Sequence, residues 1–266
     1  MPKVSIVIPC YNQGEFIEEA VESALAQTFR DFEIIVVNDG STDEVTNRLL
    51  ASFKKPQTSI ITTENQGVAM ARNTGILHAR SEYILPLDAD DRIGTTYLEK
   101  GVAILDRDPE VGIVYCLAEC FGARQGRWDI PDFSGWGMRF TNLIFCSALF
   151  RKADWEKAGG FNSNMKKGWE DWDFWLSLLE MDKKVFRIPE PLFYYRVAAG
   201  SRERSMGRSA KVEMHVQLMR NHSRLFPFQS RILLELYYLL RDSNLYRMAK
   251  KVRIPYLIGN NISNKQ

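Results

Sequence analysis

Short runs of aliphatic and β-branched residues alternate with longer helical patterns through the first hundred residues. Four of these runs, at residues 4–8, 33–37, 59–62 and 83–87, predict strands, and the stretches between them predict helices. Alternation of this kind is typical of a mostly parallel central sheet that is flanked by helices. The expected fold class is therefore α/β.

The same patterns continue less regularly along the rest of the chain. Residues 15–27 and 170–182 carry apolar side chains at helical spacing and predict amphipathic helices. Residues 111–120 predict a further strand, whereas residues 124–140 are rich in Gly, Trp and Pro and predict an irregular region. The remaining predictions are extended segments at 184–188 and 191–196 and two or three helices over 207–253.

Composition and charge exclude several classes of protein. The 266 residues are 45% hydrophobic and 26% charged, which is typical of a globular protein and not of a disordered one. Lys and Arg total 35 against 33 Asp and Glu, so the net charge of +2 gives no reason to expect a nucleic-acid partner. The four cysteines lack a C-x-x-C spacing and have no histidines near them for a zinc site.

Two apolar runs bear on localisation. The first, at residues 4–8, ends at Pro9 and is too short for the core of a signal peptide. The second, at residues 232–240, is interrupted by Glu235, whereas roughly 18 apolar residues are needed to cross a bilayer. We therefore expect a cytoplasmic protein without a transmembrane helix.

Polar residues follow the first two predicted strands. Pro9 and Tyr11 come at the end of the first strand, and Asp39 comes at the end of the second. Ligands of open α/β sheets bind at the carboxyl ends of the strands, so these residues are candidate binding residues. The alternative is a turn followed by a helix cap, which accounts for Ser41 or Thr42 but not for Asp39 as well.

An acidic cluster follows the fourth predicted strand. Asp88, Asp90 and Asp91 repel one another unless a cation or solvent offsets their charge. Such a loop suits Mg²⁺ or Mn²⁺ held by one or two carboxylates together with substrate phosphates. The alternative is a solvated acidic loop that caps the helix beginning near Thr95.

A third acidic group begins the helix predicted over residues 170–182. Asp171 lies one turn before Phe174 and Trp175 and on the same face as these apolar residues. Its carboxylate is either favoured there by the helix dipole or is an acid/base group directed into a cleft. The motif alone leaves both readings open.

Taken in order, five segments resemble the family 2 glycosyltransferases of the GT-A fold. They are SIVIPCYNQGEFIEEAVESALAQTF (5–29), FEIIVVNDGSTD (32–43), NQGVAMARNTG (65–75), YILPLDADD (83–91) and GWEDWDFWLSL (168–178). The resemblance covers roughly the first 200 residues, and the joint order of the motifs is far more specific than any one of them. We expect a GT-A domain over residues 1–200 and a helical C-terminal extension over residues 201–266.

The resemblance implies a nucleotide-sugar donor, with UDP as the expected nucleotide. Pro9, Tyr11 and Asp39 would hold the base, with the Tyr11 ring against it and Asp39 accepting from N3–H of uracil. Thymine carries the same N–H and stays open. Arg72 would lie near the base or the diphosphate.

The resemblance also implies a divalent cation, Mn²⁺ or Mg²⁺, and an inverting reaction. Asp88 and Asp90 fall on the D-x-D motif of the family, with Asp90 as the metal ligand and Asp88 reaching the ribose or the ion. Asp171 would be the general base that deprotonates a hydroxyl of a saccharide or lipid-linked saccharide acceptor. Trp169 and Glu170 are candidate substrate contacts in what we expect to be cell-surface polysaccharide or glycolipid synthesis.

One departure from the family concerns the loop after the late Tyr-Arg segment. Family members often carry a metal-binding histidine there, but residues 195–201 contain none. Arg202 and Arg204 are candidate contacts to the diphosphate instead, with solvated surface arginines as the alternative. The missing histidine also leaves open a catalytically impaired nucleotide-sugar binding protein of the same fold.

Two other enzyme classes fit the motifs less well. A sugar nucleotidyltransferase is expected to have a Gly-rich phosphate loop after the first strand, where this chain has PCYNQG. A glycoside hydrolase with paired carboxylates would not explain Tyr11 and Asp39 at the strand ends.

The C-terminal extension carries basic residues beside an apolar stripe. Two arrangements are open for it: docking on an anionic membrane surface at the inner face of the membrane, or packing against the catalytic domain or a second copy in a homodimer. The basic residues are Arg241, Arg247, Lys250, Lys251 and Arg253.

Overall fold

The computed structural model describes residues 1–197, 207–226, 232–233, 236 and 239–240. The chain divides into two compact units, Met1–Ser205 and Met206–Gln266. The boundary expected near residue 200 falls outside the described residues, as do Arg202 and Arg204.

A single mixed sheet forms the centre of the first unit. Among the described residues its strands are β1 (Val4–Cys10), β2 (Phe32–Asp39), β3 (Thr58–Thr63), β4 (Tyr83–Pro86), β5 (Arg92–Ile93), β6 (Val111–Gly122), β7 (Gly126–Trp128), β8 (Leu149–Arg151) and β9 (Lys184–Val197). Their order is β3-β2-β1-β4-β8-β6-β9-β5, with β7 paired to β6. Strands β1 to β4 pair with one another in parallel, and β6 pairs in parallel with β9. Strands β5, β7 and β8 are antiparallel to their neighbours. The α/β fold with a mostly parallel sheet is confirmed.

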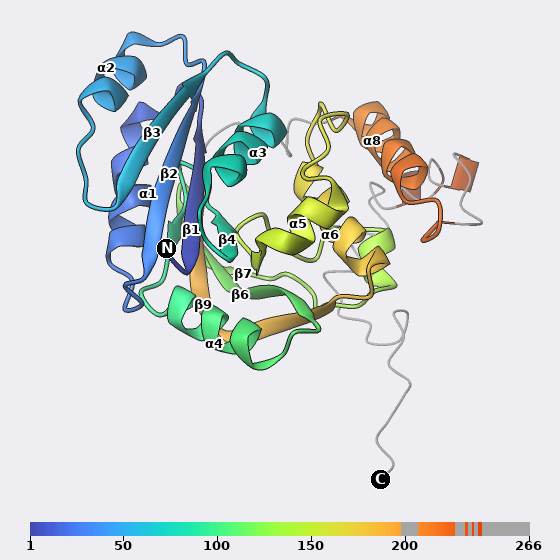
Figure 1. Cartoon of the computed structure of the whole chain (residues 1–266). Helices are drawn as coiled ribbons and strands as arrows, with labels where there is room; N and C mark the ends of the chain where they lie inside the picture. The colour runs from blue at the N-terminus through green and yellow to red at the C-terminus, as the bar shows by residue number, and fades with distance from the viewer. Residues whose placement is uncertain (198–206, 227–231, 234–235, 237–238, 241–266) are drawn as a thin grey trace. The chain divides into compact units, whose positions relative to one another are not determined.

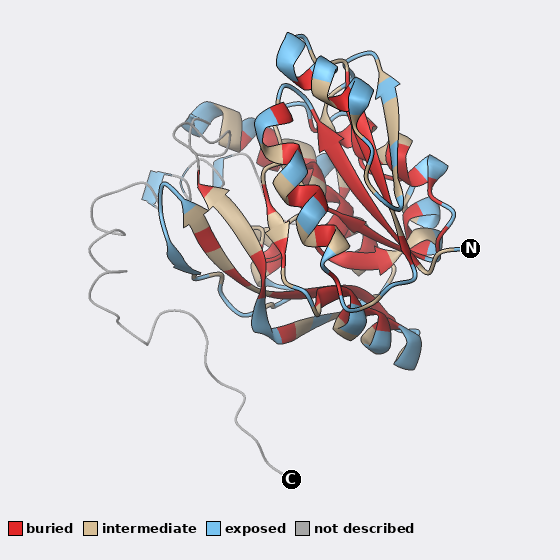
Figure 2. Cartoon of the chain, turned by 90° about the vertical axis from the view of Figure 1, so that its left-hand side faces the viewer, coloured by how far each residue is buried: buried red, intermediate tan, exposed pale blue. Residues whose placement is uncertain are grey.

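Helices cover both faces of the parallel strands. In Figure 1, α1 and α2 lie to one side of β1–β3 and α3 lies on the other. Figure 2 shows buried residues along the central strands and exposed residues on the outer faces of the helices. Every residue of β1 is buried, as expected for a strand covered on both faces. The helices of this unit are α1 (Gly14–Leu25), α2 (Glu44–Ser52), α3 (Val68–His78), α4 (Tyr97–Arg107), α5 (Lys152–Ala158) and α6 (Glu170–Glu180), with a 3₁₀ turn η1 (Gly137–Arg139).

Gly75 lets α3 approach the sheet closely. A Cβ atom at this position would lie 2.4 Å from Cγ1 of Val7 in β1 and 3.1 Å from Cγ2 of Val37 in β2. Since both neighbours are branched and buried, no larger side chain fits without moving α3. The close packing fixes α3, and with it Arg72, against the sheet.

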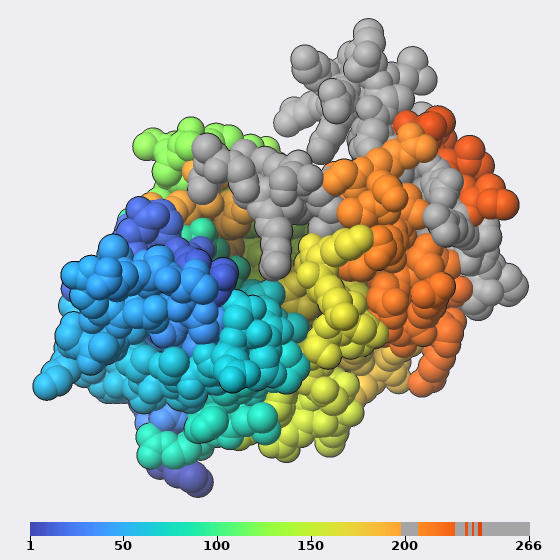
Figure 3. All heavy atoms as spheres, turned by 90° about the horizontal axis from the view of Figure 1, so that it is seen from above, coloured from blue at the N-terminus to red at the C-terminus, as the bar shows by residue number. Residues whose placement is uncertain are grey.

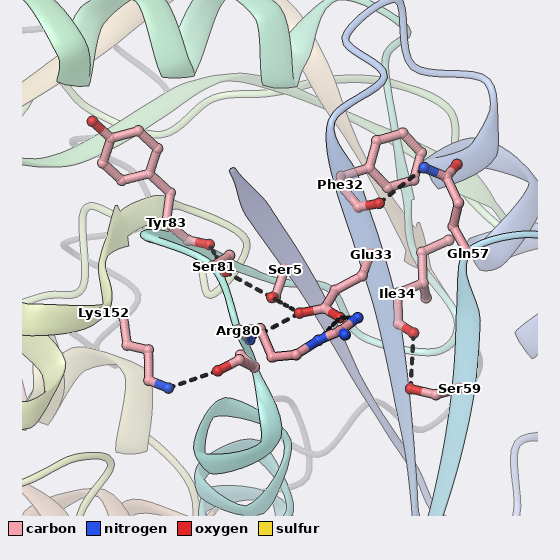
Figure 4. Close-up of polar contacts among 11 residues, drawn as sticks. Ser5, Phe32, Glu33, Ile34, Gln57, Ser59, Arg80, Ser81, Tyr83 and Lys152 are labelled. Atoms are coloured by element: carbon pink, nitrogen blue, oxygen red, sulfur yellow. Dashed lines mark hydrogen bonds and ion pairs between the residues drawn. The ribbon is translucent and has the colours of Figure 1, made fainter. Parts of the chain in front are cut away.

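A polar cluster ties the strands together at their amino ends, away from the motifs at the carboxyl ends. The Ser81 hydroxyl donates to Ser5, Ser5 donates to Glu33, and Arg80 donates to the other oxygen of Glu33 at 2.7 Å (Figure 4). The Lys152 ammonium donates to the carbonyl of Ala79 nearby. These contacts hold β4 in place beside β1 and β2.

The predicted elements differ from the observed ones mainly in the second half of the unit. The region 124–140, predicted to be irregular, contains the short strand β7 and the 3₁₀ turn η1. The two extended segments predicted after residue 184 form one strand, β9, whose pairing with β6 shifts register between Cys116 and Ala118. Pro189 and Pro191 lie at this irregularity. Proline has no backbone N–H to donate, and a strand tolerates it where the regular pairing is interrupted.

The second unit contains α8 (Arg208–Asn221), whose buried residues include Val212, His215 and Leu218. No helix in the described part of the chain is long and apolar enough to cross a membrane. The C-terminal basic residues, from Arg241 to Arg253, lie outside the described residues, so membrane docking and dimerisation stay predictions.

Candidate functional site

The loops after β1 and β2 meet at the carboxyl edge of the sheet. Pro9 is buried within β1, and Tyr11 follows with 44% of its surface exposed. Asn12, in the left-handed region with φ 54°, donates to the Thr42 hydroxyl and accepts from the Thr42 amide at 2.8 Å. These hydrogen bonds join the two loops and leave the Tyr11 ring accessible beside them.

Asp39 ends β2 and fixes the chain that leads into α3. Its two carboxylate oxygens accept from the backbone amides of Gln66 and Gly67, each at 2.9 Å. A carboxylate oxygen accepts more than one hydrogen bond, so a ligand N–H can still be received there. The helix after β2 is capped by Asp43, which accepts from the Thr46 amide, so the alternative of a cap at Ser41 or Thr42 is wrong.

The acidic loop after β4 crowds three carboxyl groups. Asp88 has 36% of its side chain exposed, Asp90 is half-buried and Asp91 is buried. Burial raises the pKa of Asp90 to about 6, and the charge of Asp88 adds to the rise. Burial and the same carboxylates raise the pKa of Asp91 well above its usual value.

Arg196, at the end of β9, holds this loop in place. Its backbone amide donates to the Asp91 carboxylate and its Nε donates to the carbonyl of Asp90, each at 2.8 Å. Its guanidinium also pairs with Glu19 of α1 and lies over the ring of Phe121. Arg196 of β9 thus fixes the acidic loop, and Glu19 of α1 in turn holds the Arg196 guanidinium.

The acidic loop fits a divalent cation that is shared with a ligand. Within the described residues, no three His, Cys, Asp or Glu side chains are grouped to enclose an ion. Mg²⁺ is commonly held by one or two carboxylates, with phosphate and water at its other positions, and oxygen ligands suit Mn²⁺ equally. Because burial, together with the charge of Asp88, raises the pKa of Asp90, a cation at these two residues would stabilise the ionised form of Asp90.

A tight turn comes directly before two further carboxylates, those of Glu170 and Asp171. Gly168 and Trp169 both have positive φ angles, 119° and 68°, and α6 begins at Glu170 directly after them. A non-glycine residue in the left-handed region is uncommon and is enriched at functional sites.

Trp169 is half-buried beside Trp172, which is buried and donates from Nε1 to the carbonyl of Met138 at 2.7 Å. Trp172 is therefore a core residue.

Arg72 links the turn at α6 to the acidic loop. Its guanidinium, only 2% exposed, donates to Glu170 at 2.5 Å and to Asp88 at 2.6 Å. In Figure 3 the residues of α3, in cyan, lie directly against the yellow residues that precede α6. Arg72 therefore joins two motifs that lie 98 and 16 residues from it in the sequence. Its expected contact with the nucleotide stays a prediction.

Asp171 lies beside this bridge as a half-buried carboxyl group. One of its oxygens accepts from the Trp172 amide at 2.7 Å and the other accepts from Nδ2 of Asn142 at 3.0 Å. Burial raises the pKa of Asp171 to about 7, and the adjacent Glu170 carboxylate adds to the rise. A carboxylate with such a pKa can take up a proton near neutral pH and release it again.

Sequence reasoning missed two residues near Asp171. Asn142 follows the region predicted to be irregular, and no motif or periodicity distinguishes it. Cys146 is half-buried, and its thiol faces the charges of Arg72, Asp88 and Asp171. Burial raises the pKa of Cys146 well above its usual value, so the thiol is neutral.

Several known proteins are similar to this chain in sequence. The model of the family described as "Glycosyl transferase family 2" matches residues 5–171. The chain is 32% identical over 209 residues to a chondroitin synthase of Pasteurella multocida, covering 75% of this chain and 21% of that protein. It is also 32% identical over 213 residues to an uncharacterised glycosyltransferase of Rickettsia prowazekii, covering 76% of this chain and 64% of that one. The chain thus spans about a fifth of the first relative and less than two thirds of the second.

Solved structures show the same fold at low sequence identity. S. aureus TarS 1–349 in complex with UDP-GlcNAc matches with a TM-score of 0.69 and 19% identity, over 95% of this chain and 77% of that one. A mannosyltransferase of Pyrobaculum calidifontis in complex with GDP-Man and Mn²⁺ matches with a TM-score of 0.64 and 20% identity, over 94% and 73%. The expected GT-A fold is confirmed. With the family model spanning the motifs from β1 to Asp171, the chain belongs to glycosyl transferase family 2.

Proposed function

We propose that this chain transfers a sugar from a nucleoside diphosphate sugar to an acceptor hydroxyl with inversion at the anomeric carbon. The observation that carries the proposal is the Asp171 carboxyl group, half-buried, held by two donors and with its pKa raised to about 7. It lies beside an ion-paired bridge that runs from Glu170 through Arg72 to Asp88. A base and an acidic loop are thereby kept close together.

The donor is proposed to bind across the carboxyl edge of the sheet. Tyr11 would stack on the base, Asp39 would accept its N–H, and Pro9 would shape the floor beneath it. UDP is the proposed nucleotide, supported by the complex of S. aureus TarS with UDP-GlcNAc. The mannosyltransferase complex with GDP-Man makes GDP the alternative to test.

In the proposed reaction Asp171 accepts the proton of the acceptor hydroxyl. The hydroxyl oxygen forms a bond to the anomeric carbon from the face opposite the diphosphate. The bond from that carbon to the diphosphate oxygen breaks, and its electron pair leaves with the nucleoside diphosphate. General bases of this type contribute about 100-fold to 10,000-fold in rate.

Asp88 and Asp90 would hold Mn²⁺ or Mg²⁺ together with the diphosphate. When bound, the cation would offset the negative charge that develops on the leaving nucleoside diphosphate. Arg196 keeps this loop fixed through its bonds to the Asp90 carbonyl and the Asp91 carboxylate. Trp169 and Glu170, together with Arg202 and Arg204, which lie outside the described residues, are the remaining proposed substrate contacts.

The acceptor is proposed to be a saccharide or a lipid-linked saccharide. Support comes from the names of two relatives, a chondroitin synthase and a hyaluronan synthase, each of which this chain matches over 21% of its length. We propose that the chain takes part in cell-surface polysaccharide or glycolipid synthesis in the cytoplasm, and contact with the inner face of the membrane remains part of that proposal.

Asp171→Asn tests the proposal because it removes the base and keeps the shape of the side chain. With labelled nucleotide sugars and a panel of oligosaccharide acceptors, we expect wild-type transfer and a loss of about 100-fold or more in the variant. Calorimetry should give the same UDP affinity for both proteins. A wild type that binds UDP and transfers no sugar would favour a catalytically impaired nucleotide-sugar binding protein.

A further inference from the structure

Asn142 has a side-chain amide that is held at both ends. Nδ2 donates to Oδ2 of Asp171 at 3.0 Å, and Oδ1 accepts from the backbone amide of Ile144 at 3.2 Å. Because a backbone N–H can only donate, the amide oxygen must face Ile144 and the NH₂ group must face Asp171. The orientation of the amide is therefore set by its surroundings.

The segment that carries Asn142 is packed rigidly against the start of α6. The Met138 carbonyl accepts from Nε1 of Trp172 at 2.7 Å, and the Met138 sulfur accepts from the amide of Leu143. Met138, Leu143 and Ile144 are all buried. A group on this segment thus has a fixed position relative to Asp171.

Two hydrogen bonds set the orientation of the Asp171 carboxylate. Oδ1 accepts from the Trp172 amide and Oδ2 accepts from Asn142, so the plane of the carboxylate is set by one donor on each oxygen. Each oxygen retains a further acceptor position for a substrate hydroxyl. A donor that points at the charged form also favours that form.

The charged groups near Asp171 shift its pKa in opposite directions. Glu170 on the same helix and Asp88 on the acidic loop raise its pKa, whereas Arg72 from α3 lowers it. The neutral thiol of Cys146 faces it from the chain between Asn142 and β8. Asn142, by contrast, is an uncharged side chain that donates a hydrogen bond to the Asp171 carboxylate.

We propose that Asn142 is a positioning residue for the general base: its amide orients the Asp171 carboxylate toward the acceptor hydroxyl and favours its ionised form. This inference rests on the proposed function, since it assigns Asn142 a role through Asp171. Asn142 is half-buried and acts on Asp171, not on the donor nucleotide.

Asn142→Asp is the sharpest test of this role. The replacement has the same shape and keeps an oxygen to accept from Ile144, but it turns a carboxylate oxygen toward Asp171 in place of the NH₂ donor. We expect kcat to fall about 10-fold to 100-fold, with UDP affinity and the donor KM unchanged, as for loss of one hydrogen bond to a charged group. The acid limb of the kcat/KM profile should move to higher pH, because a second carboxylate disfavours ionisation of Asp171.

Asn142→Ala removes the donor without adding a charge, and Asn221→Ala, at the end of α8, is the matched loss of an amide elsewhere. We expect Asn142→Ala to lower kcat and Asn221→Ala to leave it unchanged, with circular dichroism verifying that all variants are folded. Added to Asp171→Asn, Asn142→Ala should cause no further loss, since residues that act as one unit are not additive.

The outcomes separate the inference from the function on which it rests. Loss of transfer in Asp171→Asn with full activity and an unshifted pH profile in Asn142→Asp would overturn the role of Asn142 alone. A further loss on adding Asn142→Ala to Asp171→Asn would also overturn it, because Asn142 would then act independently. Full transfer by Asp171→Asn would overturn both the base and its positioning residue.

Discussion

Replacing Arg72 by Met should destabilise the first unit strongly. The guanidinium is 2% exposed and pairs with Glu170, whose side chain is 9% exposed, at 2.5 Å. Its second partner, Asp88, is 36% exposed and is therefore better solvated. Most of the cost comes from leaving the Glu170 carboxylate buried without its cation.

Breaking a buried ion pair by removal of one partner costs about 3–5 kcal/mol. For a unit of this size that cost lowers Tm by about 6–20 °C. Replacement of both members by apolar residues is often neutral, so Arg72→Met combined with Glu170→Met should recover a large part of the loss. The assay is thermal unfolding followed by circular dichroism and tryptophan fluorescence.

Arg48→Met is the matched control, because Arg48 pairs with Glu44 at 2.9 Å while the two side chains are 72% and 78% exposed. An exposed pair contributes about 0–1 kcal/mol, so this variant should melt close to the wild type. An Arg72→Met variant that melts with the control, or a double variant less stable than the single one, would show that the buried charge of Glu170 does not set the cost.

Three further outcomes are expected. The acid limb of kcat/KM should lie near pH 7, since burial raises the pKa of Asp171 to about 7 and the reaction needs its ionised form; initial rates that stay constant as the pH falls through that value would contradict this. Tyr11→Ala should weaken UDP binding by about 1–3 kcal/mol, the usual contribution of a ring stacked on a base, and calorimetry showing unchanged affinity would exclude such stacking. Gly75→Ala should lower the free energy of unfolding by about 1–3 kcal/mol, because the new methyl group would lie 2.4 Å from Val7; an unchanged urea midpoint would show that α3 shifts freely.

Much of the sheet could be predicted because the signals are local. Strands β1 to β4 are apolar runs separated by helical patterns, and each predicted run overlaps the observed strand. Short antiparallel strands escaped prediction: β5 has two residues and β8 has three, too few for any periodicity. The strand β9 was predicted as two segments because its prolines interrupt the pattern, while its partner β6 accommodates them by a shift of register.

The candidate site was predictable only where a motif marks it. Asp88, Asp90 and Asp171 lie in segments with a recognisable order, but the ion pairs by which Arg72 joins Asp88 to Glu170 depend on tertiary packing of α3. Asn142 lies in a segment without periodicity, and its hydrogen bond to Asp171 spans 29 residues. Contacts of this kind arise from the way the elements pack, so a single sequence carries no local signal for them.

Calorimetric titration of UDP, with and without Mn²⁺, is the most direct measurement of a nucleotide-sugar donor site in this chain. We expect UDP binding that is strengthened by Mn²⁺ and weakened by Asp90→Asn, whereas Asp171→Asn leaves it unchanged. Binding of GDP in place of UDP would retain the site and change the donor. Absence of binding to any nucleoside diphosphate, with or without the metal, would show that this chain has no such donor site.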